Sequence, residues 1–514
     1  MVKDGKIQIA QTENKQDIFL LPGMANRHGL IAGATGTGKT ITLKVMAESF
    51  SRLGVPVFLS DVKGDLAGMI SAGEETSDMQ ERIERFGLAA NGFTMQPFPT
   101  AFFDVYGRTG IPLRTTISEM GPLLLSRILD LNDLQSDLLT IAFKIADDNN
   151  LLLIDTKDLK AVLNYISENN TEFAAAYGNI SKVSVSAIMR AVVALETNGG
   201  EIFFGEPAIN IADFLARDPS GKGMINILDS RSLITNPTLY ALFLLYMLSE
   251  LFETLPEVGD QPLPKLVFFF DEAHLLFKDM PKLLTEKIEQ VVKLIRSKGV
   301  GIFFITQNPR DIPDGVLSQL GNKVQHALRA YTPADQKAVK AAAQSFRENP
   351  AFKTEDAIQA LGTGEALVSF LDESGVPAIC ERAFILPPES RMGSISDAER
   401  DTAVKSSFLY SKYANPVDPD SAYEFLQRKG LADAAAAENA ALAAANEKEL
   451  AKQKKQSDAA KKRAAKSVGN AVVGTVGREV GKNIGKSFGS FGKTLGGNVG
   501  ASLGRGILST LFKC

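Results

Sequence analysis

Residues 28–40 read His-Gly-Leu-Ile-Ala-Gly-Ala-Thr-Gly-Thr-Gly-Lys-Thr, an apolar run followed by a glycine-rich one. The second part has the spacing G-x-x-x-x-G-K-[ST] of a Walker A loop, whose glycines let backbone N–H groups point at phosphate oxygens. An apolar run at 29–32 and a helical pattern over 39–53 place the loop between a strand and a helix, as its chemistry requires. The alternative is a chance glycine-rich turn, which would not need this context.

The loop predicts a site for ATP and Mg²⁺. We expect Lys39 to reach the β- and γ-phosphates and the Thr40 hydroxyl to ligate Mg²⁺. The residues expected to surround the nucleotide are Gly33, Ala34, Thr35, Gly36, Thr37, Gly38, Lys39, Thr40 and Ile41.

A second motif lies at residues 265–274, Lys-Leu-Val-Phe-Phe-Phe-Asp-Glu-Ala-His. It has the pattern of a Walker B strand, because a continuous apolar run is typical of a parallel strand buried on both faces and ligands bind at its carboxyl end. We expect Asp271 to hold Mg²⁺, and Glu272 to orient and deprotonate the attacking water. The alternative is that the two acids cap the next helix.

Two further apolar runs end in polar residues. The run at 55–61 ends on Asp61 and continues into Lys63 and Asp65, which either line a nucleotide or polymer channel or form a plain strand-end turn. The run at 300–306 ends at Gln307. In nucleotide sites of this type such a residue senses the γ-phosphate, and the alternative is that it caps its own loop.

Buried strand patterns alternate with helical ones, which predicts an α/β fold with a mainly parallel sheet. The expected organisation is residues 1–114 for the first part of an ATPase core, 115–200 for an inserted α-helical subdomain, 201–390 for the rest of the core, 391–433 for a helical extension, 434–467 for an Ala/Lys-rich helical connector and 468–514 for a glycine-repeat basic tail. Short strands are also expected at 6–10, 18–21 and 323–329, with a hairpin from 365 to 385.

Composition sets limits on the protein class. The 514 residues are 45% hydrophobic and 23% charged, as in ordinary globular proteins. Two cysteines exclude a disulfide framework, so the cytoplasm is the expected compartment, and the three histidines lack metal-ligand spacing, so we expect no zinc site. The most apolar windows are about half a membrane span, which predicts no transmembrane helix.

The net charge is divided unevenly along the chain. Residues 451–514 carry thirteen Lys and Arg against two acidic residues, a net of +11, which leaves residues 1–450 with −15 out of the overall −4. Such an asymmetry suggests that the tail meets a polyanion, either nucleic acid or an acidic membrane surface, and a solvated charged helix is the alternative.

Glycine also recurs every four residues from 477 to 489 and from 492 to 504, beside large apolar residues. A helix of this kind would pair closely with another or lie on a membrane, whereas a disordered tail is the alternative.

The Walker A loop, Asp-Val-Lys-Gly-Asp at 61–65, Phe-Asp-Glu-Ala-His at 270–274 and Ile-Thr-Gln-Asn-Pro at 305–309 occur in one order. In these motifs the chain resembles the HerA-like branch of the HerA/FtsK superfamily of ATPases, over about residues 15–390. The resemblance implies a RecA-like P-loop NTPase core, a ring of six identical subunits and ATP-driven movement of duplex DNA or of a protein. HerA carries a β-barrel ahead of Walker A, whereas 32 residues precede the motif here, so assembly through that barrel is not carried over.

The resemblance also implies an arginine that reaches the γ-phosphate of a neighbouring subunit. Arg329, at the end of the strand expected at 323–329, ranks slightly ahead of Arg296, near the end of the helix after Walker B.

Two functions follow from the sequence. The first is a hexameric ATPase that translocates or unwinds DNA. The second is a nucleotide-switched ATPase that acts on a protein complex, with its 468–514 tail at a partner or a membrane. The charge of −15 on residues 1–450 argues mildly against strong DNA affinity, although a few residues such as Lys63 would suffice locally.

Overall fold

The computed structural model describes residues 1–233, 237–277 and 282–467. A first compact unit spans Met1–Lys429, and a second begins at Gly430, within the long helix α16 (Ala422–Ser467). The helical connector expected at 434–467 is therefore helix throughout, while the glycine-repeat tail at 468–514 lies outside the described residues.

A single large sheet runs through the first unit. Its parallel part has the strand order β11-β4-β10-β9-β5-β8-β6-β7. The bounds are β4 Gly29–Ala32, β5 Val57–Asp61, β6 Thr100–Asp104, β7 Ile111–Pro112, β8 Ile225–Asp229, β9 Leu266–Phe270, β10 Val300–Thr306 and β11 Asn322–Gln325. The α/β class with a mainly parallel sheet is confirmed.

Antiparallel strands extend the sheet beyond β11. The expected hairpin is present as β12 (Glu365–Ser369) and β13 (Glu381–Ile385), with Glu365 opposite Phe384. Strand β12 pairs with β11, and β13 pairs with β2 (Lys6–Thr12), which also pairs with β1 (Val2–Lys3) and β3 (Asp17–Leu20). The first residues of the chain are thereby joined to a hairpin that follows them by more than 360 positions in the sequence.

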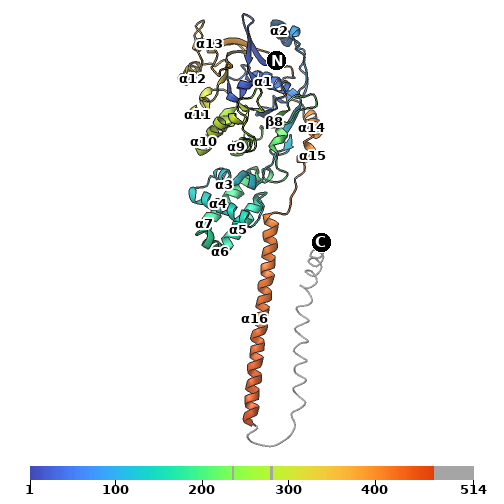
Figure 1. The fold of residues 1–514 in the computed structure, drawn as a ribbon, viewed down its shortest axis with the longest axis vertical. Helices are drawn as coiled ribbons and strands as arrows, with labels where there is room; N and C mark the ends of the chain where they lie inside the picture. The colour runs from blue at the N-terminus through green and yellow to red at the C-terminus, as the bar shows by residue number, and fades with distance from the viewer. Residues whose placement is uncertain (234–236, 278–281, 468–514) are drawn as a thin grey trace. The chain divides into compact units, whose positions relative to one another are not determined.

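Helices follow many of the strands. Helix α1 (Lys39–Arg52) follows β4, α9 (Pro237–Thr254) precedes β9, and α10 (Lys282–Ile295) precedes β10. Helices also fill the segment expected to be a helical subdomain, where they lie together (Figure 1): α3 Ile117–Ile128, α4 Asp133–Asp148, α5 Thr156–Glu168, α6 Asn170–Tyr177 and α7 Lys182–Leu195. The remaining α-helices in the described residues are α2 Ser77–Arg85, α8 Glu201–Phe203, α11 Asp314–Leu317, α12 Pro333–Gln344, α13 Thr354–Ala360, α14 Asp397–Ser406 and α15 Tyr410–Tyr413.

Aromatic packing fixes the central strands side by side. Every residue of β9 is buried, and its Phe269 and Phe270 stack on Phe303 and Phe304 of β10 with ring centroids 5.2 and 5.5 Å apart. Such pairs add to the burial of their surface. A Cβ at Gly29 would lie 2.4 Å from the Phe303 ring, so glycine lets β4 approach β10 at this point.

The structure differs from the sequence expectations in where one strand ends and in how far the first compact unit extends. The strand expected at 323–329 stops at Gln325, because the chain then leaves the sheet to run along the Walker A loop, where the Ala327 carbonyl accepts from the Ala34 N–H. Residues beyond 390 also continue the first unit, since Tyr413 is fully buried and its carbonyl accepts from Arg114.

Among the described residues, no single helix is long and apolar enough to cross a membrane. One pair, Asn170–Tyr177 with Lys182–Phe203, meets that criterion together but is bent by 101°.

Candidate nucleotide-binding site

The Walker A loop has the curled backbone that its glycines predict. Gly36 and Gly38 have φ of 77° and 116°, in the region that L side chains rarely adopt, and Gly38 immediately precedes α1. A Cβ at Gly33 would lie 2.5 Å from the Cβ of His326, whereas one at Gly36 would meet open space. The loop thus packs tightly against His326 at Gly33 and is open at Gly36.

Lys39 lies folded over this loop. Its ammonium group donates to the carbonyls of Gly33 (2.6 Å) and Ala34 (3.0 Å), and burial lowers its pKa. Both acceptors belong to the loop, so Lys39 can exchange these carbonyls for phosphate oxygens by a change of side-chain rotamer. Thr40 follows in the first turn of α1 and is half-buried.

His326 supports the loop from beneath. It is fully buried, its Nδ1 lies 3.0 Å from the Glu365 carbonyl, and its Nε2 lies 2.8 Å from the Thr42 hydroxyl of α1. A carbonyl can only accept, so Nδ1 carries the proton and Nε2 accepts from Thr42. Burial lowers the pKa of His326 to about 4, which keeps the ring neutral.

Strand register brings the second motif to the same edge of the sheet. Thr306 of β10 lies opposite Ala32 of β4, and Phe304 lies opposite Phe270 of β9, so Gln307 and Asp271 both follow at the carboxyl edge beside the Walker A loop. Asp61 follows on the other side of β9, since Ser60 pairs with Phe270.

Asp271 is buried among other acids. Burial first, and then the charges of Glu272, Asp65 and Asp61, raise its pKa to about 7. Asp61 is held by the N–H groups of Gly64 (2.7 Å) and Leu66 (3.2 Å), yet burial and Asp65 raise its pKa to about 6. This concentration of negative charge favours a cation.

Glu272 is held by several partners at once. Lys63 Nζ lies 2.6 Å from its Oε1, and Gln307 Nε2 donates to both carboxylate oxygens at 3.2 Å. His274 Nδ1 lies 3.4 Å from Oε2. Burial opposes ionisation, but the hydrogen bond and charge of Lys63, with Gln307, outweigh it and lower the pKa of Glu272. Its backbone has φ 48° and ψ 49°, and its side chain makes no capping bond to the helix that follows, so the capping alternative does not describe it.

The structure bears on two alternatives left open by the sequence. In the 61–65 segment, Asp61 closes a strand-end turn while Lys63 contacts Glu272 of the Walker B motif. Gln307 contacts Glu272 while the neighbouring Asn308 caps the following turn, so Gln307 is not a loop cap, and its sensing of the γ-phosphate stays a prediction.

Mg²⁺ is implied by the motifs, and the residues present fit it. Thr40 supplies a hydroxyl and Asp271 a carboxylate, the oxygen ligands that Mg²⁺ prefers. The Oδ1 atom of Asp65 is buried without a hydrogen-bond partner among the described residues, and burial, with the charge of Glu272, raises the pKa of Asp271, as a bound cation would offset.

The two candidate arginines lie elsewhere. Arg329 is exposed beyond the end of β11, where its guanidinium donates to the carbonyls of Gln359 (2.6 Å) and Leu361 (3.3 Å) at the end of α13. Arg296 precedes β10, at the opposite edge of the sheet from the Walker A loop, and pairs with Asp260 at 3.2 Å. Neither contacts the nucleotide site of its own chain through the interactions described, as a residue that acts on a neighbouring subunit requires.

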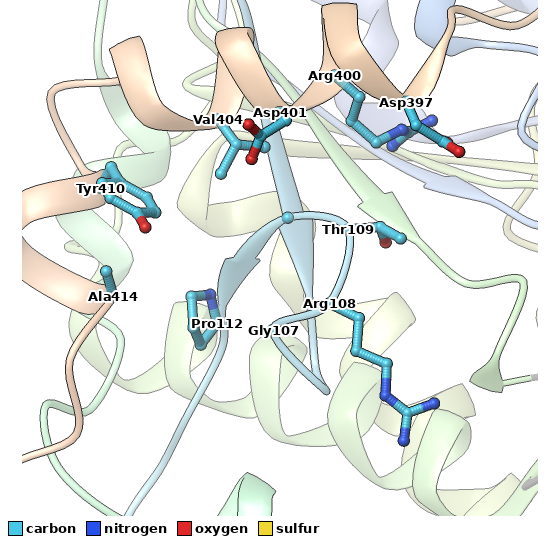
Figure 2. A pocket seen from close by; sticks show the side chains of 11 residues that line it. Gly107, Arg108, Thr109, Pro112, Asp397, Arg400, Asp401, Val404, Tyr410 and Ala414 are labelled. Carbon is cyan, nitrogen blue, oxygen red and sulfur yellow. The ribbon is translucent and has the colours of Figure 1, made fainter.

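A separate cavity of about 420 Å³ lies further along the same sheet edge, between the β6–β7 loop and helices α14 and α15 (Figure 2). Side chains of both charges line it, including Arg108, Arg400, Asp397 and Asp401. It contains no Walker A or Walker B residue and is therefore not the nucleotide site.

Comparison with known proteins identifies the family. The family described as "Helicase HerA-like C-terminal" matches residues 6–513. The chain belongs to this family of HerA-like P-loop ATPases.

Two archaeal relatives of this HerA-like chain carry the name DNA double-strand break repair helicase HerA. The protein from Sulfolobus acidocaldarius is 31% identical over 99 residues, which is 19% of either chain. That from Sulfurisphaera tokodaii is 26% identical over 351 residues, 66% of this chain and 62% of the relative. The matched stretches thus span less than two thirds of the length of these relatives.

Solved structures show the fold of the HerA-like chain. The unbound monoclinic form of the bacterial conjugative coupling protein TrwB is 14% identical, with a TM-score of 0.50, over 74% of this chain and 89% of that one. Plasmid coupling protein TrwB in complex with a non-hydrolysable GTP analogue gives the same score and identity over 77% and 91%. The RecA-like P-loop core expected from the sequence is therefore confirmed as a fold.

Proposed function

We propose that this HerA-like chain is an ATP-hydrolysing motor that acts on duplex DNA as a homohexamer. The observation that carries the ATPase part is the convergence of Lys39, Asp271, Glu272 and Gln307 at the carboxyl ends of the adjacent strands β4, β9 and β10. These side chains have the types and positions that phosphoryl transfer to water requires.

Each residue has a distinct role in this proposal. The Walker A loop binds the phosphates through its backbone N–H groups, and Lys39 neutralises charge on the β- and γ-phosphates. Thr40 and Asp271 hold Mg²⁺, which supplies further charge neutralisation when bound. Glu272 accepts the proton of the attacking water, and Gln307 orients the Glu272 carboxylate through both of its oxygens.

DNA as the substrate is supported by family membership and by the names of the two archaeal relatives. The proposed ring rests on the family resemblance, in which an arginine of a neighbouring subunit completes the site. Arg296 and Arg329, whose described contacts lie away from their own nucleotide site, are the candidates for that arginine.

The test is ATP turnover by the full chain with and without duplex DNA, at low and at physiological salt, with Lys39→Ala as the inactive control. We expect basal turnover, stimulation by DNA, and weaker stimulation at the higher salt because phosphate contacts depend on counterion release. No phosphate release above that of Lys39→Ala would refute the ATPase. Turnover that DNA leaves unchanged at both salt concentrations would refute the DNA motor, and a monomer by light scattering would refute the ring.

A further inference from the structure

Lys63 forms an ion pair with the proposed catalytic carboxylate of Glu272. The pair is close, at 2.6 Å, and asymmetric, because the Glu272 side chain is 5% exposed whereas that of Lys63 is 40% exposed. A general base needs a free oxygen lone pair directed at the water it deprotonates. Lys63 on one oxygen and Gln307 on both take up three of the about four acceptor sites of the carboxylate. The charge of Lys63 also lowers the pKa of Glu272, which makes the carboxylate a weaker base.

A second exposed cation, Arg231, packs against the turn that carries Lys63. Arg231 follows β8, the neighbour of β5, and a Cβ on Gly64 would lie 3.1 Å from Cδ of Arg231. The Arg231 stem therefore lies against the turn formed by Asp61 to Leu66. Its side chain is 43% exposed, so Lys63 and Arg231 both face solvent from adjacent strand ends.

Both cations can leave their partners without stranding a buried charge. Asp229, the partner of Arg231, also accepts from the Thr109 hydroxyl at 2.8 Å and lies 3.6 Å from the buried guanidinium of Arg400. The Nη1 atom of Arg400 has no hydrogen-bond partner within the described parts of the chain. Figure 2 shows Arg400 of α14 and Thr109 at this edge of the sheet. Likewise, when Lys63 moves away, Glu272 keeps the hydrogen bonds from Gln307 and the nearby charge of Lys39, which also lowers its pKa.

We infer that Lys63 is a positioning residue that holds Glu272 out of action until a nucleic-acid phosphate draws the Lys63 ammonium group away, with Arg231 binding a neighbouring phosphate of the same strand. The inference rests on the proposed ATPase and adds how its turnover is regulated. Two half-exposed cations at neighbouring strand ends match a nucleic-acid backbone, which presents phosphates at regular intervals. The carboxylate partner of each cation keeps other contacts after the cation has moved to a phosphate.

The test compares steady-state ATP turnover of the full chain and of Lys63→Ala, with and without a defined duplex DNA. We expect Lys63→Ala to raise kcat without DNA by about tenfold, which corresponds to about 1.4 kcal/mol, toward the stimulated rate of the parent protein. KM for ATP should not change, and stimulation by DNA should fall to about onefold. Lys144→Ala, which removes an exposed lysine paired with Asp148 on α4, is the matched control and should behave as the parent.

Two further measurements separate regulation from structural damage. Binding of a fluorescent ATP analogue by Lys63→Ala reports whether the site is folded, and Lys63→Met, which keeps the alkyl stem, serves if the alanine variant does not fold. Arg231→Ala should need more DNA for half-maximal stimulation and reduce the slope of log affinity against log salt by about one.

Each contrary outcome has a different meaning. Loss of turnover by Lys63→Ala with ATP binding retained would make Lys63 part of the hydrolytic machinery and overturn the inference. A Lys63→Ala protein whose ratio of DNA-stimulated to basal rate equals that of the parent would also overturn it. Stimulation of the parent by vesicles of anionic phospholipid but not by DNA would overturn the choice of partner. ATP turnover that no polyanion changes would leave the ATPase standing and refute the regulation, whereas no turnover in any protein would refute both.

Discussion

Lowering the pH should weaken the support beneath the Walker A loop through His326. The pKa of this buried imidazole is about 4, against 6.5 for an unperturbed one. As the pH falls, the unfolded chain therefore takes up the proton first. The stabilisation from the neutral ring is complete above the unfolded pKa and is lost as the pH falls from 6.5 toward 4. Between about pH 7.5 and about pH 5 the loss is about 2 kcal/mol in the free energy of unfolding.

The assay is urea unfolding of the parent and of His326→Gln at both pH values, followed by circular dichroism. Glutamine does not titrate, so the difference in free energy of unfolding between the two proteins should shrink by about 2 kcal/mol at the lower pH. Asp271 and Asp61, whose raised pKa values act in the opposite direction, are present in both proteins and cancel in this difference. A difference that is equal at the two pH values would show that His326 is not held neutral, and would refute the reasoning.

Three other predictions concern the site directly. Gly33→Ala should destabilise the protein by about 1–3 kcal/mol more than Gly36→Ala in thermal melts and should abolish ATP binding in titrations. Both variants carry the strain of a positive φ, but only the Cβ at Gly33 would also overlap His326. Gln307→Ala should lower kcat about tenfold while the Kd for ATP stays parental, since it loses only the orientation of Glu272; a changed Kd would place Gln307 on the nucleotide. The sequence ranked Arg329 ahead of Arg296, but Arg329 donates to two carbonyls at the end of α13, whereas the partner of Arg296 is the exposed Asp260, so we now expect Arg296 to act in trans. Mixing with Lys39→Ala should therefore restore turnover to Arg296→Ala, and restoration to Arg329→Ala instead would return the role to Arg329.

The sequence predicted those parts of the nucleotide site that lie within short contiguous motifs. The Walker A loop and the strand followed by Asp271 and Glu272 have patterns set by local backbone and burial requirements, and the structure brings them to the same edge of the sheet, on either side of β10. Gln307 was predictable for the same reason, since it follows a wholly buried strand.

What the sequence did not reveal depends on contacts between distant segments. His326 contacts Thr42 across 284 positions and belongs to no motif. The ion pair of Lys63 with Glu272 likewise needs β5 and β9 to be neighbours, which neither pattern states. The strand end near Arg329 was misplaced because an apolar pattern does not show where a chain leaves a sheet to follow another loop.

The most direct test of the central claim is ATP turnover by Glu272→Gln, with nucleotide binding measured in the same protein. Glutamine preserves the size of the side chain but cannot accept the proton of the attacking water. We predict that ATP binding stays at the parental level while turnover falls by about 10²-fold or more. Hydrolysis by Glu272→Gln at the parental rate would contradict the assignment of Glu272 as the base and, with it, the placement of the catalytic site.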